Sequence, residues 1–184
     1  MKEIIAIVAV CLAAYANSLD NEFHYDDEHS IQRNIYIRDL SNISLFFKDP
    51  STFSVDHDKG MFRPLLLVTY ALNYAWGGYE VFGYHLVNLA LHAATACLVM
   101  WLARLLGGGG RWAFGAGLLF AVHPVCSEPV NYISSRSESL AGLCYLASLA
   151  LFIRATRQVG GRWIYGSWGA LVAGLLTKAT VITL

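Results

Sequence analysis

Four consecutive residues near the amino terminus have side chains that could carry out acid–base chemistry. Asp26, Asp27, Glu28 and His29 follow directly after Tyr25. Neighbouring carboxylates raise one another's pKa, and a nearby bilayer adds desolvation, so one of them could serve as a general base. The three carboxylates could instead bind a divalent cation such as Mg²⁺ or Mn²⁺ through their oxygens. A solvated acidic loop with neither role is the third interpretation.

A second group of polar residues lies further along the chain. His123 closes an apolar stretch, and Glu128, Arg136 and Glu138 follow within sixteen residues. The run Ser135-Arg136-Ser137-Glu138 has the form of a capping box, which predicts that Glu138 caps the start of a helix. Arg136 would then lie in the first turn, where a cation opposes the helix dipole. This position favours a functional role for Arg136, such as holding a phosphate.

Three further sets of polar side chains lie in or beside apolar stretches. His85, Asn88 and His92 share one face of a predicted helix. The two imidazoles would lie roughly 10 Å apart along the axis, too far for one metal ion, so interhelical packing is favoured for Asn88 and His92, whereas His85 could reach an external site. Lys178 lies in an apolar run. It either has a functional role within the membrane or extends its ammonium group to the membrane–water interface. Arg63 is either functional or an interfacial anchor.

The composition indicates that membrane helices position these residues. The 184 residues are 56% hydrophobic and only 14% charged, and the mean hydropathy is +0.46. A soluble domain usually carries about 25% charged residues. The sequence therefore predicts an all-α, multi-pass membrane protein. It disfavours a disordered chain, a disulfide scaffold and a basic domain with a nucleic-acid partner.

The apolar stretches predict about five crossings joined by two external loops. The predicted crossings are residues 4–19, 81–106, 112–123, 138–153 and 163–182. The external loops are residues 20–80 and 124–137. In the first loop, apolar residues at helical spacing from Leu40 to Phe47 predict a short helix on the membrane surface. Pro64–Trp76 is too short to cross and is expected to form a re-entrant or interfacial helix.

The signs of the charges predict how the chain is oriented. With a cytoplasmic amino terminus, the cytoplasmic segments would hold six cations and one acid, Glu3, which satisfies the positive-inside rule. The cations are Lys2, Arg104, Arg111, Arg154, Arg157 and Arg162. The other twelve acids would lie on the external face or at its boundary. The zero net charge therefore conceals a separation of charge across the membrane.

Four ordered stretches resemble the multi-pass glycosyltransferases of the GT-C class, in particular the transmembrane and tetratricopeptide-repeat O-mannosyltransferases and their bacterial relatives. The resemblance extends over most of the chain. The matching stretches are Asn21–Asp27 with Ile31 and Asn34, Phe62–Leu65, Gly83–Asn88 with His92, and Phe120–Val125 with Glu128, Val130 and Ser135–Glu138. Since family members carry further crossings and often a tetratricopeptide array, the chain is expected to be the amino-terminal part of such a transmembrane domain.

The resemblance implies an inverting transfer of a sugar, usually mannose, from a dolichyl or other polyprenyl phosphate. The acceptor would be a protein or glycan hydroxyl on the lumenal or periplasmic side. Asp26 or Asp27 would deprotonate that hydroxyl. The residues expected to hold the departing lipid phosphate are Arg63, Arg136 and Lys178, and those expected at the donor pocket are His85, His123 and Glu128.

The resemblance also implies partners and a location. The expected partners are a lipid-linked sugar donor, a protein or glycan acceptor and the lipid bilayer. The expected location is a bacterial plasma membrane with an external active site, or alternatively the membrane of the endoplasmic reticulum. The rival interpretation is a non-catalytic membrane subunit or transporter whose external charges bind an ion or a partner.

Overall fold

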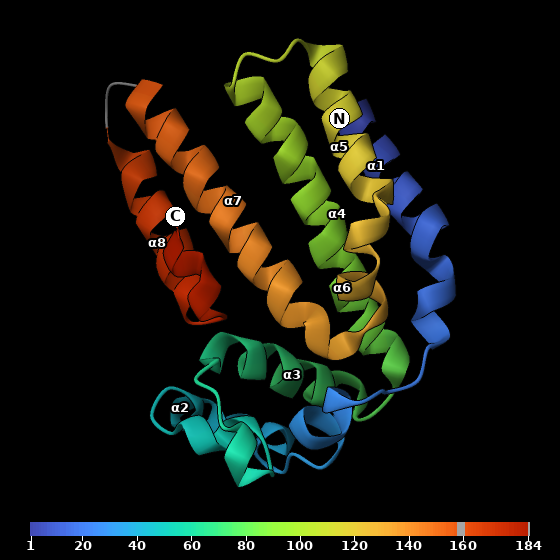
Figure 1. Ribbon diagram of the computed structural model, residues 1–184, viewed down its shortest axis with the longest axis vertical. Helices are drawn as coiled ribbons and strands as arrows, with labels where there is room; N and C mark the ends of the chain where they lie inside the picture. Colours follow the sequence, from blue (N-terminus) through green and yellow to red (C-terminus); the bar gives the residue numbers. More distant parts are fainter. Residues whose placement is uncertain (158–160, 184) are drawn as a thin grey trace.

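The computed structural model describes residues 1–157 and 161–183, and every regular element within them is helical. The long helices stand side by side, except for α3, which lies across the foot of the bundle that the others form (Figure 1). These helices are α1 Lys2–Tyr15, α3 Pro64–Gly77, α4 Val81–Leu105, α5 Gly110–Val122, α7 Arg136–Arg157 and α8 Arg162–Leu175. The all-α prediction is confirmed.

Short helical turns make up the rest of the described chain. In the first loop they are η1 Ala16–Asp20, η2 Glu28–Gln32, η3 Tyr36–Arg38, η4 Leu40–Asn42, α2 Ile43–Phe46, η5 Pro50–Phe53 and η6 His57–Lys59. Beyond α5 they are η7 Pro124–Cys126, α6 Glu128–Asn131, η8 Ile133–Ser135 and η9 Ala179–Thr183. The predicted surface helix from Leu40 to Phe47 corresponds to η4 and α2.

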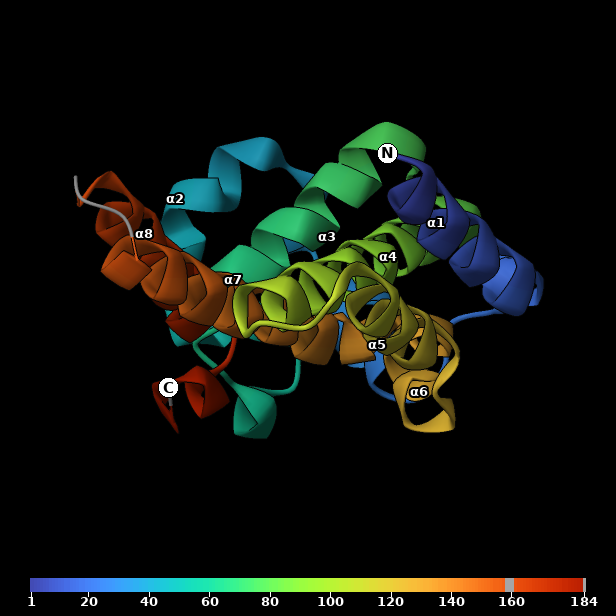
Figure 2. The same cartoon turned by 90° about the horizontal axis from the view of Figure 1, so that it is seen from above.

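Helix α4 is the centre of the bundle, with α1 and α8 on opposite sides of it (Figure 2). It packs against α1, α5 and α7. Its stripe of small and apolar residues, including Ala93, Ala96 and Met100, faces Ile7 of α1 and Ala113 of α5. Small residues let helices approach closely, which is how helices associate in a medium where apolar burial gives no driving force.

Within residues 1–157 and 161–183, three helical segments are long and apolar enough to cross a membrane. They are Lys2–Asp20, Val81–Leu105 and Ile133–Arg157. A fourth crossing is formed if Gly110–Val122 and Pro124–Asn131, which meet at a bend of 54°, act as one broken span. These segments overlap the first four predicted crossings, which remain predictions.

The fifth predicted crossing, residues 163–182, remains a prediction. Helix α8 covers its first part but has only 14 residues. At 1.5 Å per residue it rises roughly 21 Å, less than the hydrocarbon core of about 30 Å. The chain then turns at Leu176 and continues into η9.

The first loop is a folded layer with its own apolar core. Buried side chains from its turns meet α3, the start of α4 and η8. These side chains are Ile31, Ile37, Phe46, Phe53, Leu66, Leu67, Tyr70, Ala71, Tyr84 and Ile133. Helix α3 lies across the bundle, as expected for an interfacial helix rather than a crossing (Figure 1). The layer therefore holds its polar residues in fixed positions against the bundle.

The basic residues and the acidic loop lie at opposite ends of the bundle. The α4–α5 connection, the end of α7 and the start of α8 are at the end remote from the first loop (Figure 1). There, Glu3 pairs with Arg104. The Arg154 guanidinium lies over the rings of Trp163 and Trp101, at 4.4 and 5.9 Å. The fold thus keeps apart the two sets of charges that the sequence analysis assigned to opposite sides.

Gly117 allows α5 to approach α4 and α1 closely. A Cβ atom there would meet Ile7 Cδ1 at 2.8 Å, and Ala96 O and Met100 Cβ at 3.0 Å each. We expect Gly117→Leu to lower the melting temperature of the purified protein, since overpacking costs about 1–3 kcal/mol. Gly115→Leu is the matched control, because its side chain would enter open space on the same helix. Equal melting temperatures for the two variants would contradict this packing.

Candidate functional site

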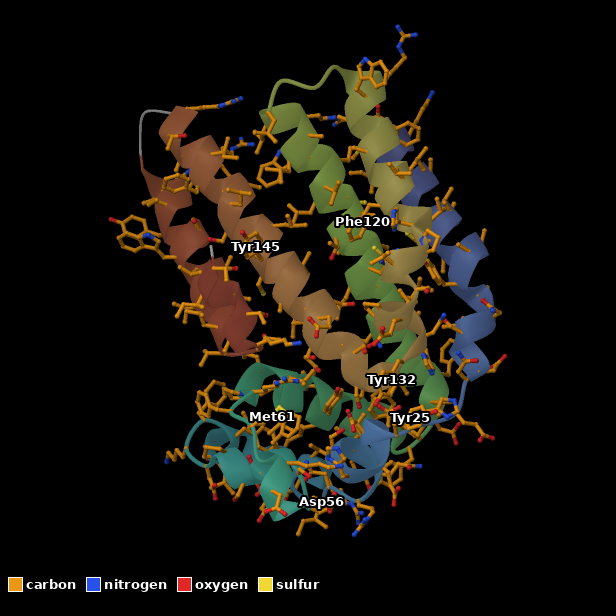
Figure 3. The ribbon with its side chains drawn as sticks, viewed as in Figure 1. Tyr25, Asp56, Met61, Phe120, Tyr132 and Tyr145 are labelled. Atoms are coloured by element: carbon orange, nitrogen blue, oxygen red, sulfur yellow. The ribbon has the colours of Figure 1, made fainter. Side chains whose placement is uncertain are left out.

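The candidate site lies where the first loop meets the segment joining α6 to α7. Tyr132 lies close to Tyr25 at this junction (Figure 3), and the two rings meet edge to face with centroids 6.5 Å apart. The Asp26 N–H donates a hydrogen bond to the Tyr132 hydroxyl at 2.9 Å. Tyr25 has a φ of 45°, a left-handed conformation that is uncommon outside glycine. This turn at Tyr25 places Asp26 next to Tyr132.

The two neighbouring aspartates have opposite environments. The Asp26 side chain is 64% exposed, whereas Asp27 is only 1% exposed. Asp27 Oδ2 accepts from the His24 N–H at 3.0 Å, and Oδ1 accepts from the N–H of Ser134 at 2.8 Å and from its hydroxyl. Asp27 thus ties the first loop to η8, and Asp26 is the carboxylate that a substrate can reach.

Burial raises the pKa of Asp27 above its ordinary value of 3.8. The hydrogen bonds from His24 and Ser134 act in the opposite direction, because they stabilise the ionised carboxylate. Desolvation is the larger effect. Asp27 is therefore a poor general base despite the raised pKa, because its oxygens are occupied and out of reach of a substrate.

Asp26 is linked to two buried polar residues. His29 Nε2 lies 3.3 Å from Asp26 Oδ1, and His29 Nδ1 lies 2.9 Å from Ser54 Oγ. The Ser30 hydroxyl donates to the carbonyl oxygen of Asp26 at 2.6 Å. The exposed carboxylate is therefore attached to a well-packed part of the loop.

The acidic run does not gather around a common point. Glu28 turns away to Arg33, with 3.6 Å between Glu28 Oε1 and the guanidinium. Asp27 is enclosed by its own donors. Within residues 1–157 and 161–183, no group of three or more His, Cys, Asp or Glu residues is arranged to hold a metal ion. The geometry gives no support to a divalent cation at Asp26, Asp27 and Glu28.

Arg136 is fully buried and its guanidinium is bound by neutral groups of the protein. Its Nε donates to Asn88 Oδ1 at 2.7 Å, and its Nη2 donates to the Tyr84 carbonyl oxygen at 2.9 Å. Its Nη1 donates to Asn73 Oδ1 at 2.7 Å and to Thr69 Oγ1 at 3.1 Å. Arg136 therefore joins α3 and α4 to the first turn of α7.

This burial changes the interpretation of Arg136. The side chain has no exposed surface, and the rings of Tyr70 and Tyr84 also face its guanidinium, at 5.0 and 5.6 Å. A lipid phosphate cannot reach it in this conformation. The expectation that Arg136 binds the phosphate is therefore not supported, and the residue instead fixes the position of the first-loop layer.

Two other cations stand at the start of α7. Arg63 Nη1 donates to Ser137 Oγ at 3.3 Å, and Lys178 pairs with the Glu138 carboxylate. The capping-box prediction is therefore right about where the helix starts but wrong about its polar contacts. Glu138 reaches Lys178, and Ser135 Oγ donates to Glu128 Oε1 at 3.3 Å.

The remaining predicted residues lie at different depths. His85 is buried, with Nε2 3.0 Å from the Asn21 carbonyl oxygen, so it anchors the loop rather than facing a ligand. His123 and Glu128 are exposed. His92 Nε2 lies 3.0 Å from the Ala121 carbonyl oxygen, which agrees with the predicted interhelical packing.

Three cavities form a chain along α5, α6 and α7. The first, about 350 Å³, includes His123 and shares Phe120 and Cys126 with a second of about 110 Å³. The second shares Glu138 and Gly142 with a third of about 170 Å³. Phe120 lines the first two cavities and Tyr145 lines the third, and Figure 3 labels both side chains. The three cavities together are called the groove. The groove is mainly apolar and passes the Glu138–Lys178 pair.

Comparisons with known proteins identify relatives of the chain. Protein O-mannosyl-transferase TMTC2 of Homo sapiens is 36% identical over 95% of this chain and 22% of its own length. Protein O-mannosyl-transferase Tmtc1 of Drosophila melanogaster is 35% identical over 95% of this chain and 21% of its own. The chain is homologous to the TMTC protein O-mannosyl-transferases. It spans about a fifth of the length of these relatives.

The homology confirms the family resemblance, and the candidate spans identify an integral membrane protein. A third TMTC relative, Tmtc3 of Drosophila melanogaster, is 32% identical over 99% of this chain and 23% of its own length. No family model and no solved structure matches the chain. The geometry of the site therefore rests on the structure described above.

Several residues of the candidate site were not predicted from the sequence. They are Ser54, Thr69, Asn73, Tyr132 and Ser134. Asn73 carried a usable signal, because an amide inside the apolar stretch Pro64–Trp76 needs a buried partner. Ser134 carried none, since it stands among other serines and its contact with Asp27 joins distant parts of the chain.

Proposed function

We propose that the protein is a membrane glycosyltransferase that transfers a sugar from a polyprenyl or dolichyl phosphate to a hydroxyl group, with inversion. The observation that carries the proposal is the exposed carboxylate of Asp26. The Asp26 backbone is bound to Tyr132, in the segment that leads into α7, and the first turn of α7 contacts the cations Arg63 and Lys178. The TMTC relatives, which are named protein O-mannosyl-transferases, support mannose as the sugar and a protein as the acceptor.

Asp26 is the general base in this proposal. As the acceptor O–H bond breaks, the proton moves to the Asp26 carboxylate and the oxygen forms a bond to the sugar C1. The bond between C1 and the phosphate oxygen breaks, and its electron pair stays on the lipid phosphate. Attack opposite the leaving phosphate inverts the configuration at C1. The products are the glycosylated acceptor, the lipid phosphate and a protonated Asp26.

Arg63 and Lys178 stabilise the departing phosphate. Their contacts are with neighbouring residues of the first turn of α7, Ser137 and Glu138. The amino terminus of this 22-residue helix adds a partial positive charge. A phosphate that gains negative charge as the C1–O bond breaks is stabilised by such fixed positive groups. Arg136 holds this helix start in place and takes no direct part.

The apolar groove accommodates the lipid chain of the donor. It extends from the Glu138–Lys178 pair toward Phe120 and His123. A polyprenyl chain needs an apolar path that begins at its phosphate, and this groove provides one beside the proposed phosphate ligands. His123 lines this groove, and Glu128 lies on α6, between His123 and the start of α7.

The proposed orientation has the first loop on the lumenal or periplasmic side and the arginine-rich end in the cytoplasm. The charge distribution supports it, because basic residues collect on the cytoplasmic side of membrane proteins. Of the two membranes considered from the sequence, the animal relatives favour the endoplasmic reticulum. Nothing in the comparisons points to a bacterial plasma membrane.

The phosphate role predicts a specific kinetic defect. We expect Arg63→Gln to lower kcat/KM for polyprenyl-phosphate mannose about 10- to 100-fold, because a charge-assisted hydrogen bond contributes about 1.5–3 kcal/mol. Transfer by the purified protein in lipid nanodiscs measures this. Lys48→Gln removes an exposed first-loop cation and should leave the value unchanged. Equal kcat/KM for the two variants would argue against a phosphate at Arg63.

A further inference from the structure

A chain of three polar side chains runs from the exposed carboxylate into the first-loop layer. Asp26 Oδ1 lies 3.3 Å from His29 Nε2, and His29 Nδ1 lies 2.9 Å from Ser54 Oγ. His29 is 6% exposed and Ser54 is 4% exposed. Only the Asp26 end of the chain reaches solvent, so the two buried members can act on chemistry only through Asp26.

For a neutral His29, the hydrogen-bond partners favour one tautomer. Ser54 Oγ accepts from the N–H of Asp56 at 3.0 Å, which leaves the Ser54 hydroxyl hydrogen free to donate to His29 Nδ1. With Nδ1 as acceptor, the neutral imidazole carries its hydrogen on Nε2. An ionised carboxylate can only accept, so this Nε2–H donates to Asp26 Oδ1. All three groups are satisfied in one consistent direction.

The segments that carry this chain are held together by a fourth residue. Buried Asn34 donates through Nδ2 to the carbonyl oxygens of Ser30, Thr52 and Phe53, at 3.2, 3.0 and 3.2 Å. These contacts join the π-helical turn Glu28–Gln32, which carries His29, to the residues directly before Ser54. The imidazole is therefore fixed before any substrate arrives.

We propose that His29 is a positioning residue for Asp26, and this inference rests on the proposed function. The side chain of an exposed aspartate on a loop can rotate freely. Proton transfer from the acceptor requires one orientation of the carboxylate, so this rotational freedom is lost when the reaction occurs. The His29 donor fixes Oδ1. Among the described residues, none donates a hydrogen bond to Asp26 Oδ2, which is left to take the proton from the acceptor hydroxyl.

The positioning role concerns the chemical step rather than donor binding. Holding a reacting group in its productive geometry removes an entropic barrier, and a displacement of about 1 Å can cost about 100-fold in rate. The donor phosphate is bound elsewhere, at Arg63 and Lys178 in the proposed function. Loss of the His29 donor should therefore lower kcat and leave the KM for the donor unchanged.

Two substitutions that differ by one methylene group test this role. In His29→Gln the side-chain amide can still reach Asp26, whereas in His29→Asn it is too short and stays on the Ser54 side. We expect His29→Asn to lower kcat about 10- to 100-fold with an unchanged donor KM, and His29→Gln to recover most of the rate. The assay is mannose transfer from polyprenyl-phosphate mannose by the purified protein in nanodiscs.

Controls separate this role from a purely structural one. Glu28→Gln alters an exposed acid beside His29 and should keep the wild-type kcat. If His29→Asn does not fold, Ser54→Ala supplies the test, because it removes the Nδ1 partner and leaves the imidazole in place. A drop in kcat without a change in donor KM would then support the role.

The outcomes distinguish the inference from the function on which it rests. A wild-type protein that transfers sugar, together with full kcat in His29→Asn or in Ser54→Ala, would overturn the positioning role alone. Equal loss of kcat in His29→Gln and His29→Asn would overturn it as well, because the glutamine amide still donates to Asp26 and should preserve most of the rate. Absence of transfer by the wild-type protein would instead remove the proposed function.

Discussion

Replacing Asp26 by asparagine should lower kcat for sugar transfer by about 10²- to 10⁴-fold, the usual contribution of a general base. The amide keeps the size of the side chain but cannot take the acceptor's proton. Because Asp26 is exposed and its main structural contact, with the Tyr132 hydroxyl, is made by the backbone N–H, the variant should fold normally. The kcat is measured as mannose transfer from polyprenyl-phosphate mannose by the purified protein, and folding is checked by a melting curve for each sample.

Glu28→Gln is the matched control for this prediction, since it removes an exposed carboxylate two residues away. It should keep the wild-type rate. Asp26→Asn with unimpaired transfer would show that another group accepts the proton. The structure offers no equivalent neighbour, because Asp27 is enclosed by its donors from His24 and Ser134.

Replacing Arg136 by alanine should destabilise the fold more than any other substitution considered. Three buried acceptors, on Asn73, Tyr84 and Asn88, would lose their donor, as would the half-buried Thr69 hydroxyl. An unsatisfied buried group costs about 1–3 kcal/mol, so the combined loss is comparable to a typical folding stability of about 5–15 kcal/mol. We expect little folded protein, measured as the monodisperse fraction after purification in detergent.

The matched control for Arg136→Ala lies on the same helix. Arg157 is exposed at the opposite end of α7, and Arg157→Ala should give a wild-type yield of folded protein. A folded Arg136→Ala protein with the wild-type melting temperature would contradict the structural role and would revive a direct role in phosphate binding. The two variants together therefore test the reassignment of Arg136.

The helices could be predicted from the sequence because hydrophobic patterning is local. Residues 81–106 were predicted as a crossing, and α4 occupies Val81–Leu105. Hydrophobic pattern alone does not show where a helix ends. Residues 163–182 are apolar throughout most of their length, but α8 ends at Leu175 and the chain turns. A turn of this kind depends on packing against α3 and α7 rather than on hydropathy.

The polar contacts of the site could not be predicted, because they join distant parts of the chain. Asp26 and Asp27 are the same residue type in adjacent positions, and their opposite burial is decided by Tyr132 and Ser134, more than a hundred residues away. The sequence narrowed the base to these two residues and could go no further. The position of Arg136 in the first turn of a helix likewise favoured a role in phosphate binding. In the structure its guanidinium binds groups on α3 and α4 instead.

The most direct test of the central claim is mass spectrometry of glycopeptides from cells of the source organism. Three strains are compared: one with the gene, one without it, and one carrying Asp26→Asn. The account predicts peptides with a hexose on Ser or Thr in the first strain and their loss from the other two. Identical glycopeptides in all three strains would contradict a sugar transfer that depends on Asp26.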